Sequence, residues 1–553
     1  MDSSTLTQIL LSRQQLAYFT RQQTLSAPAT SSTATLATAE QTIYFNRSRF
    51  ITPVLDEFQN NTAASVTYSC SATQTVLLHT ALLLQWLAQS GLGPTHVARR
   101  IYMYSTLVSA AWNWVSPPTA KRIGGTKDEW NWSTGSPLSD INDRSIWTTH
   151  VIGTLIGNVS ATGQINPASV YAYEREQMHW SAEEQSAEVD RVLQSGNYAT
   201  FQAAWATWLA SRSADGSASL PAPTSAQIAN LALQIQTDSP TLPAFADVNG
   251  WTPLKLPMKP AKQGYLTFFW NTVRSTGLST ADEADISGVA SVFVPDEAER
   301  AVEVGEVVDI TATLTDVQKC TAEFWAGGPN TVTPPGMFLW FWKEYVRSQN
   351  TAADKCVYSL LDLGIHLFEA SRLTWGLKGQ YNQARPIQEI RRRYAGETLI
   401  GYDGEGVSGE LWMPYQELNF VTPPFADFPS GHSAFSQMFA NVMDSWFGGA
   451  VPPVGMSRDD LWLLSPLFKQ TDGTSQGGIG EVQIASGRSL VQVGAVPAAS
   501  VTLSWNTWQA IADSAGISRL YGGIHCISAH QGSQALANEA HERIDGVWGI
   551  TRT

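Results

Sequence analysis

The apolar residues of this chain recur mainly at helical spacing. In the clearest segments they return about every three to four residues, which predicts amphipathic or buried helices. These segments are residues 63–91, 184–212, 225–237, 337–349, 353–371, 431–447, 500–514 and 530–546. Alternation typical of strands is weak and is confined to residues 302–310, 482–484 and 490–493. The pattern therefore predicts a mainly α-helical fold of the bundle type, with long decorated loops and a few short strands.

The same pattern predicts three regions along the chain. Residues 1–60 include a stretch of Ser, Thr and Ala without any period, so we expect an N-terminal arm. An N-terminal helical region is expected over 61–300 and a C-terminal helical region over 301–553. A long insert at 448–499, rich in Gly, Ser, Pro and Val, interrupts the helical periodicity of the second region.

Composition narrows the class of protein. Hydrophobic residues make up 43% of the 553 residues, which is enough for a large core and excludes a wholly disordered chain. Charged residues make up only 15%, against a usual value of about 25%. A surface so poor in charge is compatible with a homo-oligomer.

Charge and hydropathy exclude two kinds of partner. The net charge of −14 argues against nucleic acid, because phosphate binding needs a basic surface. The most apolar stretch, residues 76–88, is too short to span a membrane.

The N-terminus lacks the features of a signal peptide, which favours a cytoplasmic or non-classically secreted protein. The four cysteines lack paired spacing, so free thiols are expected.

Three segments of the C-terminal half carry candidate chemistry: KGQYNQARP (378–386), PSGHS (429–433) and SRLYGGIH (518–525). Singly, each has a plain structural interpretation, such as solvated charges on a helix face or a structural histidine. Two arginines present planar forks of donors and the lysine adds a point charge, a set that suits a tetrahedral oxyanion. A serine hydroxyl and a glycine at the start of a predicted helix would add donors and a helix dipole. The remaining histidines show no ligand spacing; they include His79, His96, His150, His179, His366 and His541.

Taken together, the ordered pattern K-x6-RP, PSGH, SR-x5-H resembles the superfamily of vanadium-dependent haloperoxidases and type-2 phosphatidic acid phosphatases. The resemblance covers roughly residues 310–545 and implies a bound vanadate, one per chain. It implies that His525 bonds the vanadium and that His432 and Lys378 are catalytic. The residues that it implies around the vanadate are Lys378, Arg385, Ser430, Gly431, His432, Arg519 and His525.

Two aromatic residues bear on the choice of halide. Trp375 and Phe425 occupy positions at which chloroperoxidase-type vanadium enzymes carry a Trp and a Phe beside the halide. The resemblance therefore implies a halide pocket lined by both residues. The alternative is that they are ordinary core aromatics in a chain with 21 Trp residues.

One position departs from the family pattern. The superfamily commonly has an Asp four residues after the position of His525, and this chain has Ala529. In the phosphatases that Asp orients the nucleophilic histidine. Its absence leaves open what holds the second nitrogen of His525, and it weakens a phosphatase interpretation more than a haloperoxidase one.

The resemblance implies an enzyme that oxidises bromide or chloride with hydrogen peroxide to hypohalous acid, which then halogenates a small organic acceptor. No haem or flavin is expected. The main alternative is a soluble acid phosphatase with His525 as nucleophile and His432 as leaving-group acid. A second alternative is a non-catalytic helical protein with a relict anion pocket, against which the intact cations and histidines argue.

Overall fold

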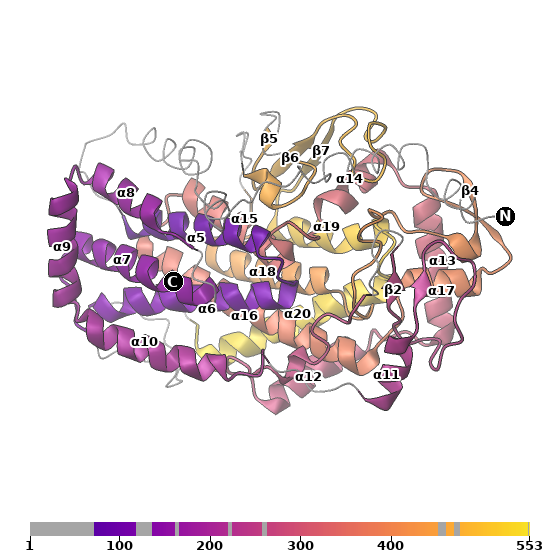
Figure 1. Cartoon of the computed structure of the whole chain (residues 1–553), viewed down its shortest axis with the longest axis horizontal. Helices are drawn as coiled ribbons and strands as arrows, with labels where there is room; N and C mark the ends of the chain where they lie inside the picture. Colours follow the sequence, from indigo (N-terminus) through magenta and orange to yellow (C-terminus); the bar gives the residue numbers. More distant parts are fainter. Residues whose placement is uncertain are drawn as a thin grey trace, which may run out of the picture.

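The computed structural model describes residues 71–117, 135–160, 165–218, 224–256, 263–451, 460–468, 476–550 and 552. Across these ranges the chain is mostly helical, with three small sheets (Figure 1). The predicted mainly α-helical fold is confirmed. The predicted arm, residues 1–60, lies outside the described residues. No helix within the described ranges combines the length and apolar character needed to cross a bilayer.

Helices provide nearly all the regular structure on both sides of residue 300. Those of the first part are α5 (Ala72–Gln89), α6 (Pro94–Val115), α7 (Ile141–Ser160), α8 (Ala168–Gln177), α9 (Ala182–Ser195), α10 (Tyr198–Ser213), α11 (Ser225–Ala232) and α12 (Thr280–Ser291). Those of the second part are α13 (Glu297–Ala312), α14 (Asp316–Phe324), α15 (Thr333–Ser348), α16 (Ala353–Tyr381), α17 (Pro386–Arg393), α18 (Gly431–Phe447), α19 (Trp508–Tyr521) and α20 (Ile527–Trp548). Short 3-10 turns cover η2 (Trp270–Thr272), η3 (Gly409–Leu411) and η4 (Leu461–Leu463).

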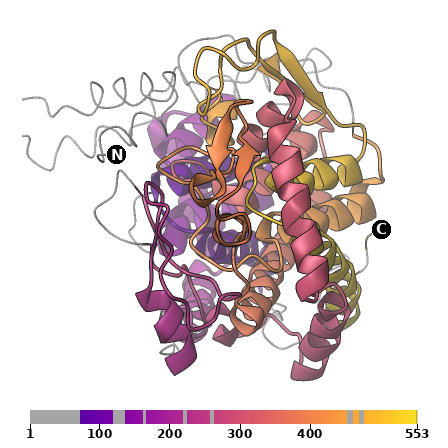
Figure 2. The same ribbon diagram turned by 90° about the vertical axis from the view of Figure 1, so that its right-hand side faces the viewer.

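The strands are short and lie outside the helical core. A parallel pair joins β1 (Ile235–Gln236) and β2 (Leu254–Lys255), and a hairpin joins β3 (Thr398–Ile400) and β4 (Gly406–Ser408). The third sheet contains β5 (Gln476–Gly477), β6 (Glu481–Ile484) and β7 (Val501–Ser504) in antiparallel order. It lies at the top of Figures 1 and 2, where β7 contacts α14.

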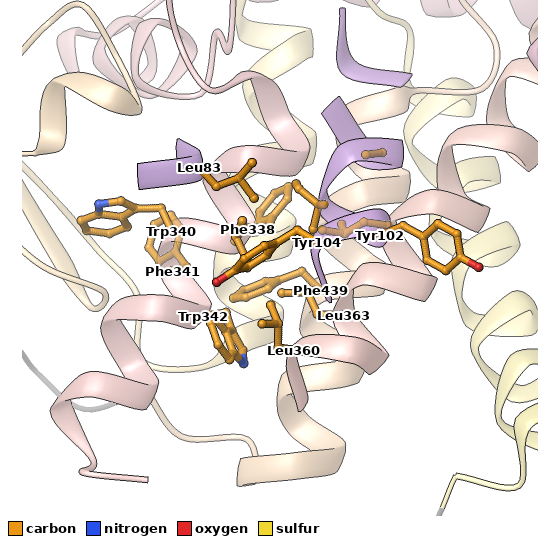
Figure 3. Close-up of a cluster of buried hydrophobic side chains, with 14 of the residues drawn as sticks. Leu83, Tyr102, Tyr104, Phe338, Trp340, Phe341, Trp342, Leu360, Leu363 and Phe439 are labelled. Carbon is orange, nitrogen blue, oxygen red and sulfur yellow. The ribbon is translucent and has the colours of Figure 1, made fainter. Parts of the chain in front are cut away.

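The 29-residue helix α16 is the centre of the core, because it packs against α6, α18 and α20. Figure 3 shows side chains from α5, α6, α15, α16 and α18 packed together; the labelled residues include Leu83, Tyr104, Phe338, Phe341, Trp342, Leu360, Leu363 and Phe439. One hydrophobic cluster contains residues from Ala72 to Trp548. Residues before and after position 300 therefore share a core, and the predicted regions 61–300 and 301–553 stay a prediction.

Five local predictions are wrong for identifiable reasons. The helix expected over 225–237 ends at Ala232, because Leu233 is extended and Ile235–Gln236 form β1. Residues 302–310 belong to α13, whose start is capped by Asp296 and whose buried valines follow a helical period. Residues 490–493 form a loop held by Ser489 and Glu323. The segment 500–514 is divided between β7 and α19, since Thr507 caps a new helix. The segment 184–212 is broken at Asn197, which adopts a left-handed conformation.

Other local predictions are confirmed. Helix α18 begins and ends at the predicted residues 431 and 447, and the predicted strand 482–484 lies within β6. Three of the four cysteines lie within the described ranges, and all three are free and buried: Cys320, Cys356 and Cys526.

Candidate anion-binding site

The predicted site residues lie at the ends of four packed helices. Lys378 is in the last turn of α16, and Arg385 directly precedes α17. Helix α16 ends at Tyr381, so Lys378 and Arg385 do not share a helix face as solvated charges. Ser430 caps α18, which begins with Gly431 and His432, while Arg519 is in the last turn of α19. His525 lies in the short connection between α19 and α20.

These ends enclose one cavity of about 250 Å³. Six of the predicted residues line it: Trp375, Phe425, Gly431, His432, Arg519 and His525. Arg385 is next to this cavity, because its Nη1 lies 3.2 Å from Nε2 of the lining residue His525. The Nζ of Lys378 lies 5.1 Å from the centre of the Phe425 ring, on the wall of the cavity. The structure thus brings the three separate sequence segments together.

The three cations are buried and are held mainly by backbone carbonyls. Lys378 donates to the carbonyls of Ala426 (2.7 Å) and Asp427 (2.9 Å). Arg385 donates from Nε to Phe425 O (2.6 Å) and from Nη1 to Ile524 O (2.7 Å). Carbonyls orient a cation without neutralising it. The charge of this cluster is therefore available to a ligand.

Burial makes the charged forms of Lys378, Arg385 and Arg519 energetically unfavourable. Desolvation holds the pKa of Lys378 well below its usual value, and the charge of Arg385 lowers it further. Desolvation lowers the pKa of Arg385 to about 10 and that of Arg519 to about 9. An anion in the cavity would favour the charged form of all three groups. The cluster is therefore complementary to a negatively charged ligand.

Several guanidinium donors lack an acceptor. Among the described residues nothing accepts a hydrogen bond from Nη2 of Arg385 or from Nε and Nη2 of Arg519, although both side chains are 1% exposed. A buried charged donor without a partner is strongly destabilising unless a ligand satisfies it. An oxyanion with several oxygens, such as vanadate or phosphate, fits this donor set.

The start of α18 adds a second feature that suits an anion. The Ser430 hydroxyl accepts from the backbone N–H of Ser433 (3.4 Å), which leaves its own proton available. A Cβ added at Gly431 would lie 3.2 Å from the Trp375 ring, so glycine keeps the backbone close to the cavity wall. The N-terminus of this 17-residue helix carries positive partial charge.

His525 is fixed by a carboxylate that lies far away in the sequence. Its Nδ1 is 2.5 Å from Oδ1 of Asp427, so Nδ1–H donates and Nε2 keeps its lone pair on the side of Arg385. Burial and the charge of Arg385 hold the pKa of His525 well below its usual value. Nε2 is therefore an unprotonated nitrogen suited to bond a metal or to attack phosphorus.

Asp427 is itself held by an ion pair. Its Oδ2 lies 2.8 Å from Nη1 of Arg300, whose Nε donates to Glu389 (2.7 Å). Burial alone would raise the pKa of Asp427, but Arg300 and His525 together hold it well below its usual range. Asp427 thus stays ionised behind His525.

His432 and Arg519 share one backbone anchor, the carbonyl of Trp325. Nε2 of His432 lies 2.8 Å from this oxygen and Nη1 of Arg519 lies 3.1 Å from it. Because Nε2–H donates to the carbonyl, Nδ1 of His432 is the nitrogen free to accept a proton. Burial and then the charge of Arg519 hold the pKa of His432 well below its usual value.

Trp375 and Phe425 form an apolar wall beside the cations. Their ring centres are 4.9 Å apart, and Trp375 is fixed by a hydrogen bond from Nε1 to Leu266 O (3.0 Å). The Arg385 guanidinium lies 5.0 Å from the Phe425 ring centre. Both rings belong to the core, yet both line the cavity.

The part of the chain that carries most of the site matches a known family. Residues 357–544 match the family model of the VCPO second helical-bundle domain. The solved structure of a holo-type bacterial vanadium-dependent chloroperoxidase is similar over 83% of this chain and 94% of its own, with 12% identity and a TM-score of 0.53. A bacterial vanadium-dependent iodoperoxidase is similar over 85% of this chain and 96% of its own, with 16% identity and a TM-score of 0.54.

The chain has the vanadium haloperoxidase fold. The resemblance inferred from the three motifs is therefore confirmed. No curated protein sequence matches the chain.

Sequence reasoning missed two residues of this vanadium haloperoxidase fold. Asp427 takes the place of the carboxylate that is absent at Ala529, and Arg300 holds Asp427. The available signal was an acidic residue five positions before His432, in the apolar, proline-rich segment FADFPSGH. Arg300 lies outside the stretch that shows the resemblance, and nothing in the sequence linked it to the site.

Proposed function

We propose that this protein is a vanadate-dependent haloperoxidase that oxidises bromide or chloride with hydrogen peroxide. In the net reaction the halide loses two electrons to peroxide, one peroxide oxygen joins the halogen as hypohalous acid, and the other leaves as water. The observation that carries the proposal is the set of unpartnered, buried guanidinium donors around Nε2 of His525. The hypohalous acid would then halogenate an organic acceptor.

The residues present fit vanadate. Lys378, Arg385 and Arg519 would hold its oxygens, together with the Ser430 hydroxyl and the Gly431 N–H, and His525 would bond the metal through Nε2. Bound vanadate supplies a Lewis acid that activates peroxide without a change in its own oxidation state.

The other side chains would control protons and water. His432 would accept and return a proton at Nδ1, because its Nε2 is held by Trp325 O. Lys378 would withdraw electron density from an oxygen in the cavity, since within the described ranges its ammonium donates hydrogen bonds to two neutral carbonyls and to no carboxylate. Trp375 and Phe425 would exclude water from the halide side of the cavity.

A second function, phosphate ester hydrolysis, is favoured by the contact between Asp427 and His525. The absence of Asp at position 529 argued against a phosphatase, but Asp427 supplies an equivalent carboxylate at 2.5 Å. With that support, Nε2 of His525 could attack phosphorus, and His432 could protonate the leaving group. The two functions would use the same cavity.

One titration distinguishes the two functions. Orthovanadate is added to a single sample of the metal-free protein while bromination of a phenolic dye and hydrolysis of an aryl phosphate are both followed. The haloperoxidase proposal expects bromination to rise and hydrolysis to fall with a common midpoint. Absence of vanadate-dependent bromination between about pH 4 and pH 8 would refute it. Fast turnover of phosphate esters, with simple inhibition by vanadate, would establish the phosphatase instead.

His525→Ala provides the control for this titration. The variant keeps the ion pair between Asp427 and Arg300, so the fold should be retained. It should lose both bromination and vanadate retention, which is measured as vanadium bound per chain after gel filtration. Retention of stoichiometric vanadium would show that His525 is not the metal ligand.

A further inference from the structure

A second cluster of titratable side chains lies between α16 and α20, two helices that pack together and are labelled in Figure 1. It contains His366 of α16 with His541 and Asp545 of α20. One potential ligand atom from each residue lies within 4.8 Å of the other two. Since His366 precedes Lys378 by twelve positions on α16, the two sites are about 18 Å apart along that helix.

The outer nitrogen of each imidazole faces an acceptor. Nδ1 of His366 lies 2.8 Å from Oδ1 and 2.9 Å from the carbonyl of Asp362. Nε2 of His541 lies 3.3 Å from the Ser445 hydroxyl and 3.5 Å from Oδ2 of Asp545, whose Oδ1 is on the side of His366. Outer acceptors of this kind orient metal-binding histidines in proteins, because they fix the tautomer that leaves the inner nitrogen unprotonated.

The inner nitrogens face each other. Nε2 of His366 and Nδ1 of His541 are 2.9 Å apart, which is the distance of a hydrogen bond that shares one proton. Oδ1 of Asp545 lies 3.8 Å from Nε2 of His366. Two imidazole nitrogens and a carboxylate oxygen are a donor set that zinc prefers.

We propose that His366 Nε2, His541 Nδ1 and an Asp545 carboxylate oxygen bind one divalent transition ion of the Zn²⁺ type. Tetrahedral zinc places two nitrogen ligands about 3.3 Å apart, so the imidazoles need to separate by only a few tenths of an ångström. The His366 side chain is fully buried, but 14% of His541 and 24% of Asp545 is exposed. Water can therefore supply the fourth ligand.

The ion would replace the proton shared by the two imidazoles. Asp362 and Asp545 supply two negative charges and Arg552 supplies one positive charge, and both imidazoles are neutral once the ion is bound. A divalent ion that displaces the proton leaves the cluster with one excess positive charge, which this buried position tolerates less well.

Arg552 is therefore a competitor of the metal. It forms an ion pair with both oxygens of Asp545, and its Nη2 lies 3.0 Å from Asp362. Its removal would free the Asp545 carboxylate and bring the metal-bound cluster to neutrality. This competition gives a test in which one substitution tightens binding while the others weaken it.

The test uses the full chain after chelator treatment. Zn²⁺ is titrated by calorimetry, and Co²⁺ is titrated while its visible absorption is followed. One equivalent should bind. His541→Ala and Asp545→Asn should each weaken binding at least tenfold, and Arg552→Gln should strengthen it several-fold. Thermal unfolding without metal shows whether each variant is folded; Asp545→Asn keeps the size of a partly exposed residue and is the reference if His541→Ala unfolds.

Two controls separate this site from the rest of the molecule. His150→Gln removes another buried histidine that faces a carboxylate, Glu174 at 2.6 Å. His525→Ala disables the proposed vanadate site. Both should bind Zn²⁺ and Co²⁺ as the native chain does. Absence of saturable binding up to about 1 mM metal, or native affinity in both His541→Ala and Asp545→Asn, would overturn the proposal. Equal affinity of Arg552→Gln and the native chain would overturn the competition by Arg552.

Discussion

Asp427 links the reactive nitrogen of His525 to the rest of the protein. It binds Nδ1 of His525 with one oxygen and Arg300 with the other. Loss of its charge would free the histidine to take the wrong tautomer and would leave Arg300 with Glu389 and the more distant Glu303 (3.8 Å). The residue therefore serves both the site and the stability of the fold.

Asp427→Asn should separate these two roles. We expect vanadate affinity to fall about 10- to 100-fold, because support of a ligating histidine is lost. The free energy of unfolding should fall by about 3–5 kcal/mol, because a buried ion pair is broken. The control is Glu389→Gln, which removes a second carboxylate that pairs with Arg300 while Asp427 stays in place beside His525. It should destabilise the protein but keep its vanadate affinity, as measured by calorimetry and urea unfolding.

The low pKa of Asp427 gives its contribution a definite pH dependence. The folded-state pKa is below the unfolded value of about 4, so the stabilisation is complete above that value and is lost as the pH falls. In Asp427→Asn the loss of stability between about pH 5 and pH 2 should be shallower than in the native chain. Parallel curves of unfolding free energy against pH would contradict this account.

Phe425 is the residue by which the halide pocket can be tested. A histidine there would add polar atoms next to Lys378 and Arg385 and admit water to the wall. Phe425→His should lower the rate of chloride oxidation relative to bromide oxidation. Phe420→His is the matched control, since Phe420 lines the same cavity without a recorded contact to the cations. Equal halide ratios in the native chain and Phe425→His would leave Phe425 with a packing role only.

The N-terminus of α18 can bind an anion only if the backbone at Gly431 lies close to that anion. A side chain at Gly431 meets the Trp375 ring at 3.2 Å, whereas a Cβ at Gly288 of α12 meets nothing within 4 Å. Gly431→Ala should weaken vanadate binding because the ring or the helix start must shift. Gly288→Ala should leave binding unchanged and stabilise the fold by about 0.5–1 kcal/mol. Calorimetric titration of both variants tests the difference, and equal affinities would remove the steric argument.

At the scale of elements, the sequence predicts the positions of helices where the local pattern of apolar residues is clear. The period of apolar residues located α18 and most of α16 and α20, and the capping of α18 by Ser430 agrees with its predicted start. The valines of 302–310 fit a strand as well as a helix, because a short apolar run has no unique period. The cap at Asp296 marks the start of a helix and so distinguishes the two.

Contacts between distant segments could not be predicted in the same way. The three motifs gave the cations, but Asp427 meets His525 across 98 positions and His366 meets His541 across 175. His366 and His541 showed no ligand spacing in the sequence because two separate helices contribute the two nitrogens. Only the packing of α16 against α20 brings them together.

For the whole molecule, the cationic cavity contrasts with a net charge of −14. The anion must be held by local donors, and these donors titrate at high pH. Arg519 and Arg385 have pKa values of about 9 and about 10 in the anion-free protein. Because a bound anion favours the charged forms of Lys378, Arg385 and Arg519, affinity for inorganic phosphate should fall as the pH rises from 8 to 10. Calorimetry at pH 8 and pH 10 measures this, and equal affinities would contradict it.

The shared core also has a consequence for how this fold can diversify. The turn between α5 and α6, including Leu92 and Gly93, lines the same cavity as Gly431 and Arg519, which lie more than three hundred residues later. The turn is partly exposed, whereas Lys378, Arg385 and Arg519 are buried. Substitutions in the turn can reshape the room left for an acceptor molecule while the charged groups keep their positions. Under the proposed function, such substitutions would alter selectivity for a product without altering the groups that bind the anion.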